Sequence, residues 1–393
     1  MIFVVCFGHF NADRLGATSG WWQLAKRIAA FGAVAALFFS ALVASAAPAA
    51  AVIEPTACKI SAPVSPAFHD PDTMPFVGDP DFVQYQATDG HGTYAGIAKT
   101  VSMRGPTFRV IRYSSGHITV LDTLVYLGVS FQPIDGSVKV VGIDGFGNVI
   151  VRVQRPGTWL GSYLGYRYDR AGHRSLLQDS PLWTSFSPVG VTPTGVVAGF
   201  AQYRGAAGNR IVEWTGAGRG TIHLLSAYLP DEAQALDRRG DIFYGNTVRL
   251  NNGQTVKLTT LGNLTYLNLQ VHAASTNAGF GTSQYGNGSL GVRWIIPSVV
   301  SGSGTVQISP TRVGYLVWIN AAGAGGDVVG DYPGNSSSDS GTRVLVTRTG
   351  KAYRLPPQFK PKYNTEPSVV IDDYGQVMYT GTDALPHLLS CPM

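Results

Sequence analysis

Short apolar runs separated by glycine turns recur along the chain from about residue 83 to the C-terminus. The clearest example is Val191–Leu225, where a turn at Gly195 leads into the apolar run Val196–Gly199. The strand-like segments Arg210–Trp214 and Thr221–Leu225 follow, with a second glycine turn between them. Short runs of β-branched and aromatic residues bounded by Gly, Pro and Asn are typical of strands. Helical periodicity is almost absent after residue 50, so we expect an all-β protein.

Related versions of this unit recur along the chain, and a glycine marks the first turn of each. These glycines are Gly92, Gly147, Gly195, Gly240, Gly279, Gly323 and Gly375. A period of roughly 40–50 residues made only of strands and turns is typical of a β-propeller with one blade per repeat. The C-terminus cuts the last repeat short, so seven blades are predicted, with six as the alternative. A β-helix or tandem sandwich domains fit this spacing less well.

An aspartate often stands just before the turn glycine, as in Asp89, Asp144, Asp237 and Asp372. A side chain at this position can accept a hydrogen bond from the backbone two residues on, which is an Asx-turn. In other repeats the position holds Thr192, Ser275 or Asn320, which can make that bond but cannot act as catalytic acids. We therefore interpret the aspartates as turn residues and not as a ring of catalytic carboxylates.

Residues 1–46 have the features of an export signal preceded by an N-terminal extension. Lys26 and Arg27 precede the apolar run Ile28–Val43, and Ala44–Ala46 supplies small residues for cleavage. The apolar run is shorter than the ~20 residues that a membrane span needs. We expect a protein that is secreted or held in the periplasm or cell envelope, with no membrane span once the signal is removed.

Cys6 lies within the signal, so the mature chain keeps Cys58 and Cys391. In an oxidising compartment, a lone pair of cysteines predicts a disulfide, and two unpaired thiols are the alternative. A bond between the two ends of the chain suits a closed ring. We therefore expect residues 47–82 to be an extended lead-in that contributes to ring closure, and residues 83–393 to be the propeller.

Composition excludes several function classes. The chain has 13% charged residues and a net charge of +5, without a run of four or more basic residues, which argues against nucleic acid. The histidines show no metal-ligand spacing, and HExxH, GxSxG and P-loop motifs are absent from the sequence. We predict no catalytic residue, no metal and no cofactor.

Two segments carry a family resemblance: Ile371–Val377, and Val191–Gly199 together with Arg210–Trp214. They resemble the bacterial extracellular repeat family named for its His-Ala-Phe signature, the HAF-type repeats. The signature position reads Arg-Ile-Val, Gly-Tyr-Arg or Arg-Val-Leu here. The resemblance covers about residues 84–390 and implies an exported β-repeat architecture without a particular activity.

Aromatic residues fall at equivalent strand positions, namely Tyr113, Tyr166, Tyr168, Trp214 and Trp294. We interpret them as packing between blades, and a platform for sugars is the alternative. The candidate binding surface lies instead in the longer connections of the second and third repeats, because loops carry function more often than the strands they join. Its residues are Trp159, Tyr163, Trp183 and Tyr203, with Glu213, which stands where other repeats have arginine.

The sequence thus predicts a monomeric, exported, non-catalytic propeller that binds an unknown extracellular protein or a cell-surface glycan. The alternative is a glycoside hydrolase or lyase acting on polysaccharide, which needs carboxylates that converge on one face. Glu213, Asp231, Glu232 and Asp327 are the candidates for that role. The fold alone does not choose between these functions.

Overall fold

The computed structural model describes residues 53–54, 58–64, 82–102, 105–125, 138–154, 162–179, 183–203, 209–226, 233–261, 269–285, 288–301, 306–314, 316–332, 342–356, 369–381 and 385–391. The predicted export signal and most of the lead-in lie outside these ranges. Val52–Met393 form one compact unit, to which all of the described residues belong. Throughout the described residues, the chain has no helix that could cross a membrane.

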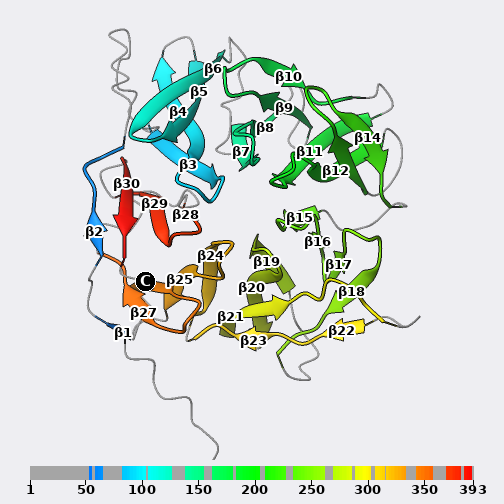
Figure 1. The fold of residues 1–393 in the computed structure, drawn as a ribbon, viewed down its shortest axis with the longest axis vertical. Coiled ribbons are helices and arrows are strands. Elements are labelled where there is room, and N and C mark those ends of the chain that lie inside the picture. Colours follow the sequence, from blue (N-terminus) through cyan, green and yellow to red (C-terminus); the bar gives the residue numbers. More distant parts are fainter. Residues whose placement is uncertain are drawn as a thin grey trace, which may run out of the picture. The chain divides into compact units, whose positions relative to one another are not determined.

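The strands form seven sheets arranged in a ring, each built on four antiparallel strands (Figure 1). Blade one contains β3 (Phe82–Thr88), β4 (Tyr94–Ser102), β5 (Gly105–Ser114) and β6 (His117–Val125); blade two contains β7 (Val138–Ile143), β8 (Val149–Gln154), β9 (Tyr163–Tyr168) and β10 (Arg174–Leu176). Blade three contains β11 (Trp183–Val191), β12 (Val197–Tyr203), β13 (Asn209–Thr215) and β14 (Thr221–Leu224); blade four contains β15 (Ala233–Leu236), β16 (Ile242–Tyr244), β17 (Thr247–Arg249) and β18 (Thr255–Leu258).

Blade five contains β19 (Leu269–Ala274), β20 (Ala278–Tyr285), β21 (Gly288–Ile295) and β23 (Thr311–Arg312); blade six contains β24 (Trp318–Ala322), β25 (Val328–Tyr332), β26 (Thr342–Val346) and β27 (Ala352–Arg354). Blade seven contains β28 (Val369–Ile371), β29 (Gln376–Thr380), β30 (Pro386–Ser390) and β2 (Lys59–Ile60). The first strand of each blade contacts the first strand of the next, and β28 contacts β3 to close the ring. The predicted seven-bladed propeller is confirmed, and the six-bladed alternative is wrong.

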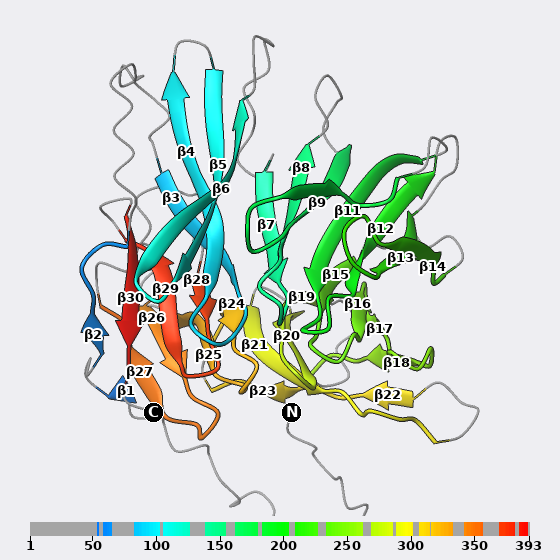
Figure 2. The ribbon, with the colours of Figure 1, turned by 45° about the horizontal axis from the view of Figure 1, so that its top comes forward.

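Segments from elsewhere in the chain complete one blade and add a fifth strand to two others. In blade seven, β2 pairs antiparallel with β30, matching Lys59 with Ser390 and Ile60 with Leu389 (Figure 2). Blade six gains β1 (Ile53–Glu54), which pairs in parallel with β27. Blade four gains β22 (Val306–Ile308), which pairs in parallel with β18. The N-terminal lead-in therefore contributes strands to two neighbouring blades.

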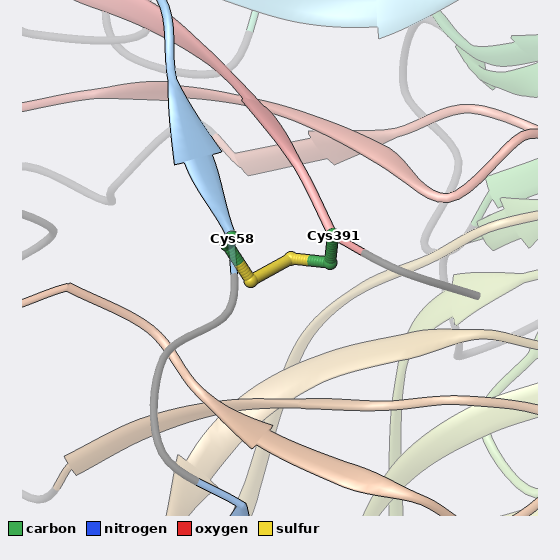
Figure 3. The surroundings of a disulfide bond; sticks show 2 residues. All are labelled: Cys58 and Cys391. Atoms are coloured by element: carbon green, nitrogen blue, oxygen red, sulfur yellow. A yellow bond between two sulfur atoms is a disulfide. The ribbon is translucent and has the colours of Figure 1, made fainter.

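The two ends of the ring are joined covalently. Cys58, just before β2, and Cys391, just after β30, form a disulfide with an S–S distance of 2.10 Å (Figure 3). Both cysteines also pack against the apolar cluster of blades six and seven. The bond links residues 333 positions apart, so it holds the seam at which the first and last segments of the chain meet.

A repeated turn joins the first and second strands of each blade. In blade two, Asp144 Oδ1 accepts the backbone N–H groups of Phe146, at 2.9 Å, and Asn148, at 2.8 Å. Asp89, Asp237 and Asp372 accept the N–H groups two and four residues on in the same way. The Asx-turn interpretation is thus confirmed. The side chain satisfies backbone donors at the turn, and the glycine that follows takes a positive φ.

Two of the predicted turns are placed differently. In blade six the turn runs from Gly323 to Asp327, and Gly326, at φ 94°, takes the glycine position. Asn320 lies three residues earlier, within β24. In blade five Ser275 keeps its position, but its N–H bonds to Ala278, so the turn is one residue shorter. Gly279 consequently belongs to β20.

The predicted aromatic residues pack between blades, with Tyr113 and Tyr166 only partly buried there. The prediction that all five are equivalent is wrong for Tyr166, which lies two residues before the shared position that Tyr168 occupies. Tyr168, Trp214 and Trp294 are fully buried. Each donates its polar hydrogen to the preceding blade or the segment leaving it: Tyr168 to Asp122, Trp214 to the Gln178 carbonyl, and Trp294 to the Thr259 carbonyl. A large apolar ring with one polar group suits such a seam, because its N–H or O–H finds a partner where the ring is buried.

A β-bulge in the first strand of blades one to six adds a further connection. The bulged residues are Gln86, Val141, Val189, Gln234, His272 and Asn320. The Gln86 side chain accepts the Val140 N–H of blade two at 2.7 Å, and Gln234 accepts the Val271 N–H of blade five at 3.3 Å. In both cases the glutamine accepts a backbone N–H from the edge strand of the next blade, and that N–H has no partner within its own sheet.

Removing the disulfide should weaken the seam without changing the fold. The Cys58→Ser/Cys391→Ser variant should lose about 2–4 kcal/mol of unfolding free energy, because the bond restricts the unfolded chain. Urea unfolding of both proteins, with and without reductant, measures this. Reductant should affect only the wild type, and an equal unfolding midpoint for the two oxidised proteins would contradict the prediction.

The turn bonds can be tested separately in blade two. Asp144→Ala leaves two backbone N–H groups and the Asn148 side chain without their acceptor, and should cost about 1–3 kcal/mol. Asp144→Asn keeps an acceptor oxygen at the same place and should cost less. Thermal unfolding of the two variants decides this, and an equal loss in both would mean that charge, not the turn bond, matters.

Candidate functional site

The turns between first and second strands form what we call the rim. It comprises residues 89–93, 144–148, 192–196, 237–241, 275–278, 323–327 and 372–376. Adjacent turns touch: Gly145 N–H donates to the Pro193 carbonyl at 2.9 Å, and Thr276 Oγ1 donates to the Ala324 carbonyl at 3.4 Å. The rim is therefore a set of tight, mutually braced turns around the ring axis.

We call the residue that stands where Asp144 does in blade two the slot residue. The position two residues after it faces solvent in blades one, two and seven, whereas in blade four it holds Arg239, which pairs with carboxylates of its own turn. In blades two and seven this position holds Phe146 and Tyr374, whose exposed fractions are 64% and 63%. In blade one it holds the exposed His91, whose ring centroid lies 6.3 Å from that of Tyr374. Blades seven, one and two are consecutive, so these three rings lie on one stretch of the rim, which we call the aromatic arc. Within it His91 contacts Tyr374, and the Phe146 ring lies near Gly195 of blade three.

The slot aspartates of the rim are occupied by structural bonds. Asp372 Oδ2 accepts the Tyr94 hydroxyl of blade one at 2.9 Å, and Asp144 Oδ2 accepts the Asn148 amide at 2.8 Å. Exposed arginines stand in neighbouring turns, with Arg170 packed against Gly147 of blade two and Arg348 near Gly325 of blade six. Together these contacts leave a surface of aromatic rings and guanidinium groups.

Blade four carries a buried pair of carboxylates at its rim turn. The side chains of Asp237 and Asp241 are 0% and 2% exposed, and Arg239 forms ion pairs with both. Arg239 also donates to the Ile296 carbonyl of blade five at 3.1 Å. Burial, followed by the nearby Asp241 carboxylate, raises the pKa of Asp237 to about 7. The Arg239 guanidinium lowers the pKa of Asp237, but its charge is shared with Asp241, so it offsets only part of the rise.

The residues predicted as a binding surface lie elsewhere. Trp159 falls outside the described residues. Tyr163 begins β9, Trp183 begins β11 and Tyr203 ends β12, so these strand ends meet on the side of blades two and three opposite the rim. Tyr163 is half-buried beneath the Arg152 guanidinium, 4.4 Å from its ring centroid.

Trp183 is a core residue, which corrects its assignment to an exposed loop. It is 9% exposed and stacks on Phe186 with ring centroids 4.9 Å apart. It belongs to the apolar cluster that also contains Trp214. The sequence places it in a connection, but β11 begins at this residue and turns its ring into the blade.

Glu213 lies between blades and not on the rim. On β13 it pairs with Ala198 and His223, and burial raises the pKa of its half-buried carboxyl, while Arg249 of blade four and His223 lower it. Arginine at the matching position reaches the next blade: Arg112 donates to the Arg170 carbonyl at 3.0 Å. Glu213 is negative where the other blades have a positive arginine, and it lies near Arg249 of blade four. Its surroundings are therefore those of a residue between two blades.

The two candidate acids of the hydrolase alternative that the structure describes, Glu213 and Asp327, do not lie together. Asp231 and Glu232 fall outside the described residues. Glu213 belongs to blade three, whereas Asp327 is fully buried in blade six, where its Oδ1 accepts the Arg348 N–H at 2.7 Å. Two blades separate them along the ring. Among the described residues, no group of His, Cys, Asp and Glu side chains is arranged to hold a metal ion.

Sequence reasoning missed Phe146 and Tyr374 as site candidates. Both stand in turns whose bonds use the slot aspartate and the backbone, so nothing in the turn requires an aromatic ring there. The sequence signal that could have identified them is an aromatic residue two positions after the slot residue, where the turn requires no particular side chain.

No family model matches this chain, and no curated protein matches it in sequence. Among solved structures, TolB from Acinetobacter baumannii is 12% identical, covers 75% of this chain and 79% of its own, and gives a TM-score of 0.38. The WD40 β-propeller domain of Doa1 is 13% identical, covers 86% of this chain and 98% of its own, and also gives 0.38. At these values the similarities carry no argument about function.

The buried carboxylates predict a pH-dependent stability. Because folding raises the pKa of Asp237 to about 7, stability should be greatest near pH 4 and fall as the pH rises to about 7. The fall should be on the order of 4 kcal/mol, since the pKa rises from 3.8 to about 7 and one pKa unit is about 1.4 kcal/mol. Urea unfolding at intervals between pH 4 and 8 measures it.

Asp237→Asn should flatten this profile, because the amide keeps the turn acceptor and removes the second charge. Asp144→Asn, in the same slot of blade two, is the matched control and should keep the slope. A slope that survives in Asp237→Asn would assign the effect to another group.

Proposed function

We propose that this protein is an exported, non-catalytic β-propeller that binds an extracellular partner, a protein or a cell-surface glycan, through the aromatic arc of its rim. The observation that carries this proposal is the exposure of Phe146 and Tyr374, at 64% and 63%, in equivalent turns. Their turns are held by the slot aspartates, so the rings are presented on a rigid frame and little conformational entropy is lost on binding.

Aromatic and arginine side chains supply much of the energy of binding interfaces when they are buried by a partner. The arc of His91, Phe146 and Tyr374 lies beside exposed Arg170, which matches that composition. Exposed apolar groups that gather on one part of a surface are typical of interaction sites. These features support a contact surface for a partner.

The carboxylates favour binding over catalysis. Those of the rim turns accept backbone N–H groups, and the two described candidate acids, Glu213 and Asp327, belong to separate blades. Hydrolysis of a glycoside needs two carboxyl groups on either side of one bond. A disulfide that joins the ends of the ring supports folding in an oxidising compartment, as expected for an exported protein.

The test is a binding screen with purified protein against a glycan array and a panel of secreted and cell-surface proteins. Phe146→Ala/Tyr374→Ala should weaken binding to any ligand found at least tenfold, because both rings are lost from the contact. Val120→Ala/Leu224→Ala, which removes exposed apolar side chains from the outer strands β6 and β14, is the control and should bind as the wild type does.

Equal binding by the arc variant would overturn the proposal, as would cleavage of a polysaccharide by the wild type in the same screen. Circular dichroism and thermal unfolding of each variant exclude a general loss of fold.

A further inference from the structure

Arg238, on the rim of blade four, contacts residues on the far side of the ring. Its Nη1 lies 2.6 Å from Asp373 Oδ2 in blade seven, and its Nη2 donates to the Asp89 carbonyl of blade one at 3.1 Å. The ring order places three steps between blade four and each of those blades. The side chain therefore extends across the ring axis at the level of the rim.

Gly90, on the opposite side of the ring, leaves room for the Arg238 side chain. A Cβ atom on Gly90 would lie 1.9 Å from Arg238 Nη2 and 2.5 Å from Asp373 Oδ2. Gly90 also has a φ of +85°, which disfavours other residues. The glycine thus provides the space in which the guanidinium and the carboxylate meet.

The repeat does not require either charge. Arg238 and Asp373 each follow the slot residue directly, and the other turns have small or apolar residues there: Gly90, Gly145, Pro193, Thr276 and Ala324. A side chain at this position is not needed for the turn bonds. The two charged residues therefore form an arrangement that is separate from the blade pattern.

Arg238 contacts both sides of the closing seam between blades seven and one. At the rim this seam is held by the Asp373 N–H, which donates to the Gly90 carbonyl at 3.1 Å. The residues directly after these two, His91 and Tyr374, are the ring pair of the aromatic arc. Asp373 Oδ1 is inaccessible to solvent and accepts no hydrogen bond within the described residues, so Arg238 is the charge partner of this carboxylate.

We propose that Arg238 is an axial latch that fixes the two rim turns of the closing seam and thereby positions His91 against Tyr374. The latch itself follows from these contacts alone. Its role in recognition rests on the proposed function, in which that ring pair contacts the partner. Arg238 is a positioning residue, because its guanidinium is committed to Asp373 and Asp89.

The experiment compares wild type, Arg238→Met, Asp373→Asn and the double variant by hydrogen exchange. Each single variant should speed exchange of the Asp373 amide and of the 89–93 turn at least tenfold, and the double variant should add little more, because either change breaks the same contact. Arg348→Met, an exposed arginine on the rim side of blade six, is the control and should leave these amides unchanged. Additive effects, or unchanged exchange, would overturn the latch.

A second measurement reports position and not stability. The His91 ring signal in a proton–carbon NMR spectrum, assigned with His91→Gln, should carry a ring-current shift from Tyr374 that Tyr374→Ala removes. Arg238→Met and Asp373→Asn should both reduce that shift, and its persistence in both would overturn the positioning role. If Arg238→Met does not fold, Asp373→Asn decides both measurements. Neither readout uses a ligand, so failure of the latch and failure of the proposed binding function are distinguishable.

Discussion

The structure depends on closing one seam. A blade buries its faces only against two neighbours, so an open ring would leave apolar faces of blades seven and one in water. The seam is held at several levels: β2 pairs with β30, a disulfide joins Cys58 to Cys391, and Tyr94 bonds Asp372 across the blades. The β2 pairing involves only two residues, both with exposed side chains, so it buries little surface. The disulfide and the rim contacts therefore contribute most to holding the ends together.

Between blades, polar groups specify how apolar faces meet. Tyr168, Trp214 and Trp294 bury their rings and bond the preceding blade, while Gln86 and Gln234 satisfy edge donors of the following one. Each such bond contributes modestly to stability, and each would cost more if left unmade in the buried seam. These bonds therefore favour the observed packing of each blade against its neighbours.

Much of the fold could be predicted from the sequence, because it follows from local rules. The Asp-x-x-Gly spacing encodes an Asx-turn, and that turn recurs in the structure. The turn of blade six was placed three residues early because Asn320 with Gly323 imitates the spacing, whereas Gly323 with Gly326 makes the bonds. The site was less predictable. Trp183 was assigned to a loop because strand starts are not visible in composition, and contacts such as Arg238 with Asp373 depend on ring closure.

Function in this fold is best sought where the repeat leaves a residue free. Trp214 and its equivalents are explained by seams, the slot aspartates by turns, and Glu213 by its facing arginine, so none of them needs a ligand. Phe146 and Tyr374 have no such explanation, since their turns close without them and their rings remain in water. Arg238 differs from the structural residues and from the exposed rings, because its guanidinium bonds Asp373 and the Asp89 carbonyl on the opposite side of the ring. A rigid rim whose free positions carry aromatic rings is suited to recognising a partner, and its stiffness comes from the same turns that build the blades.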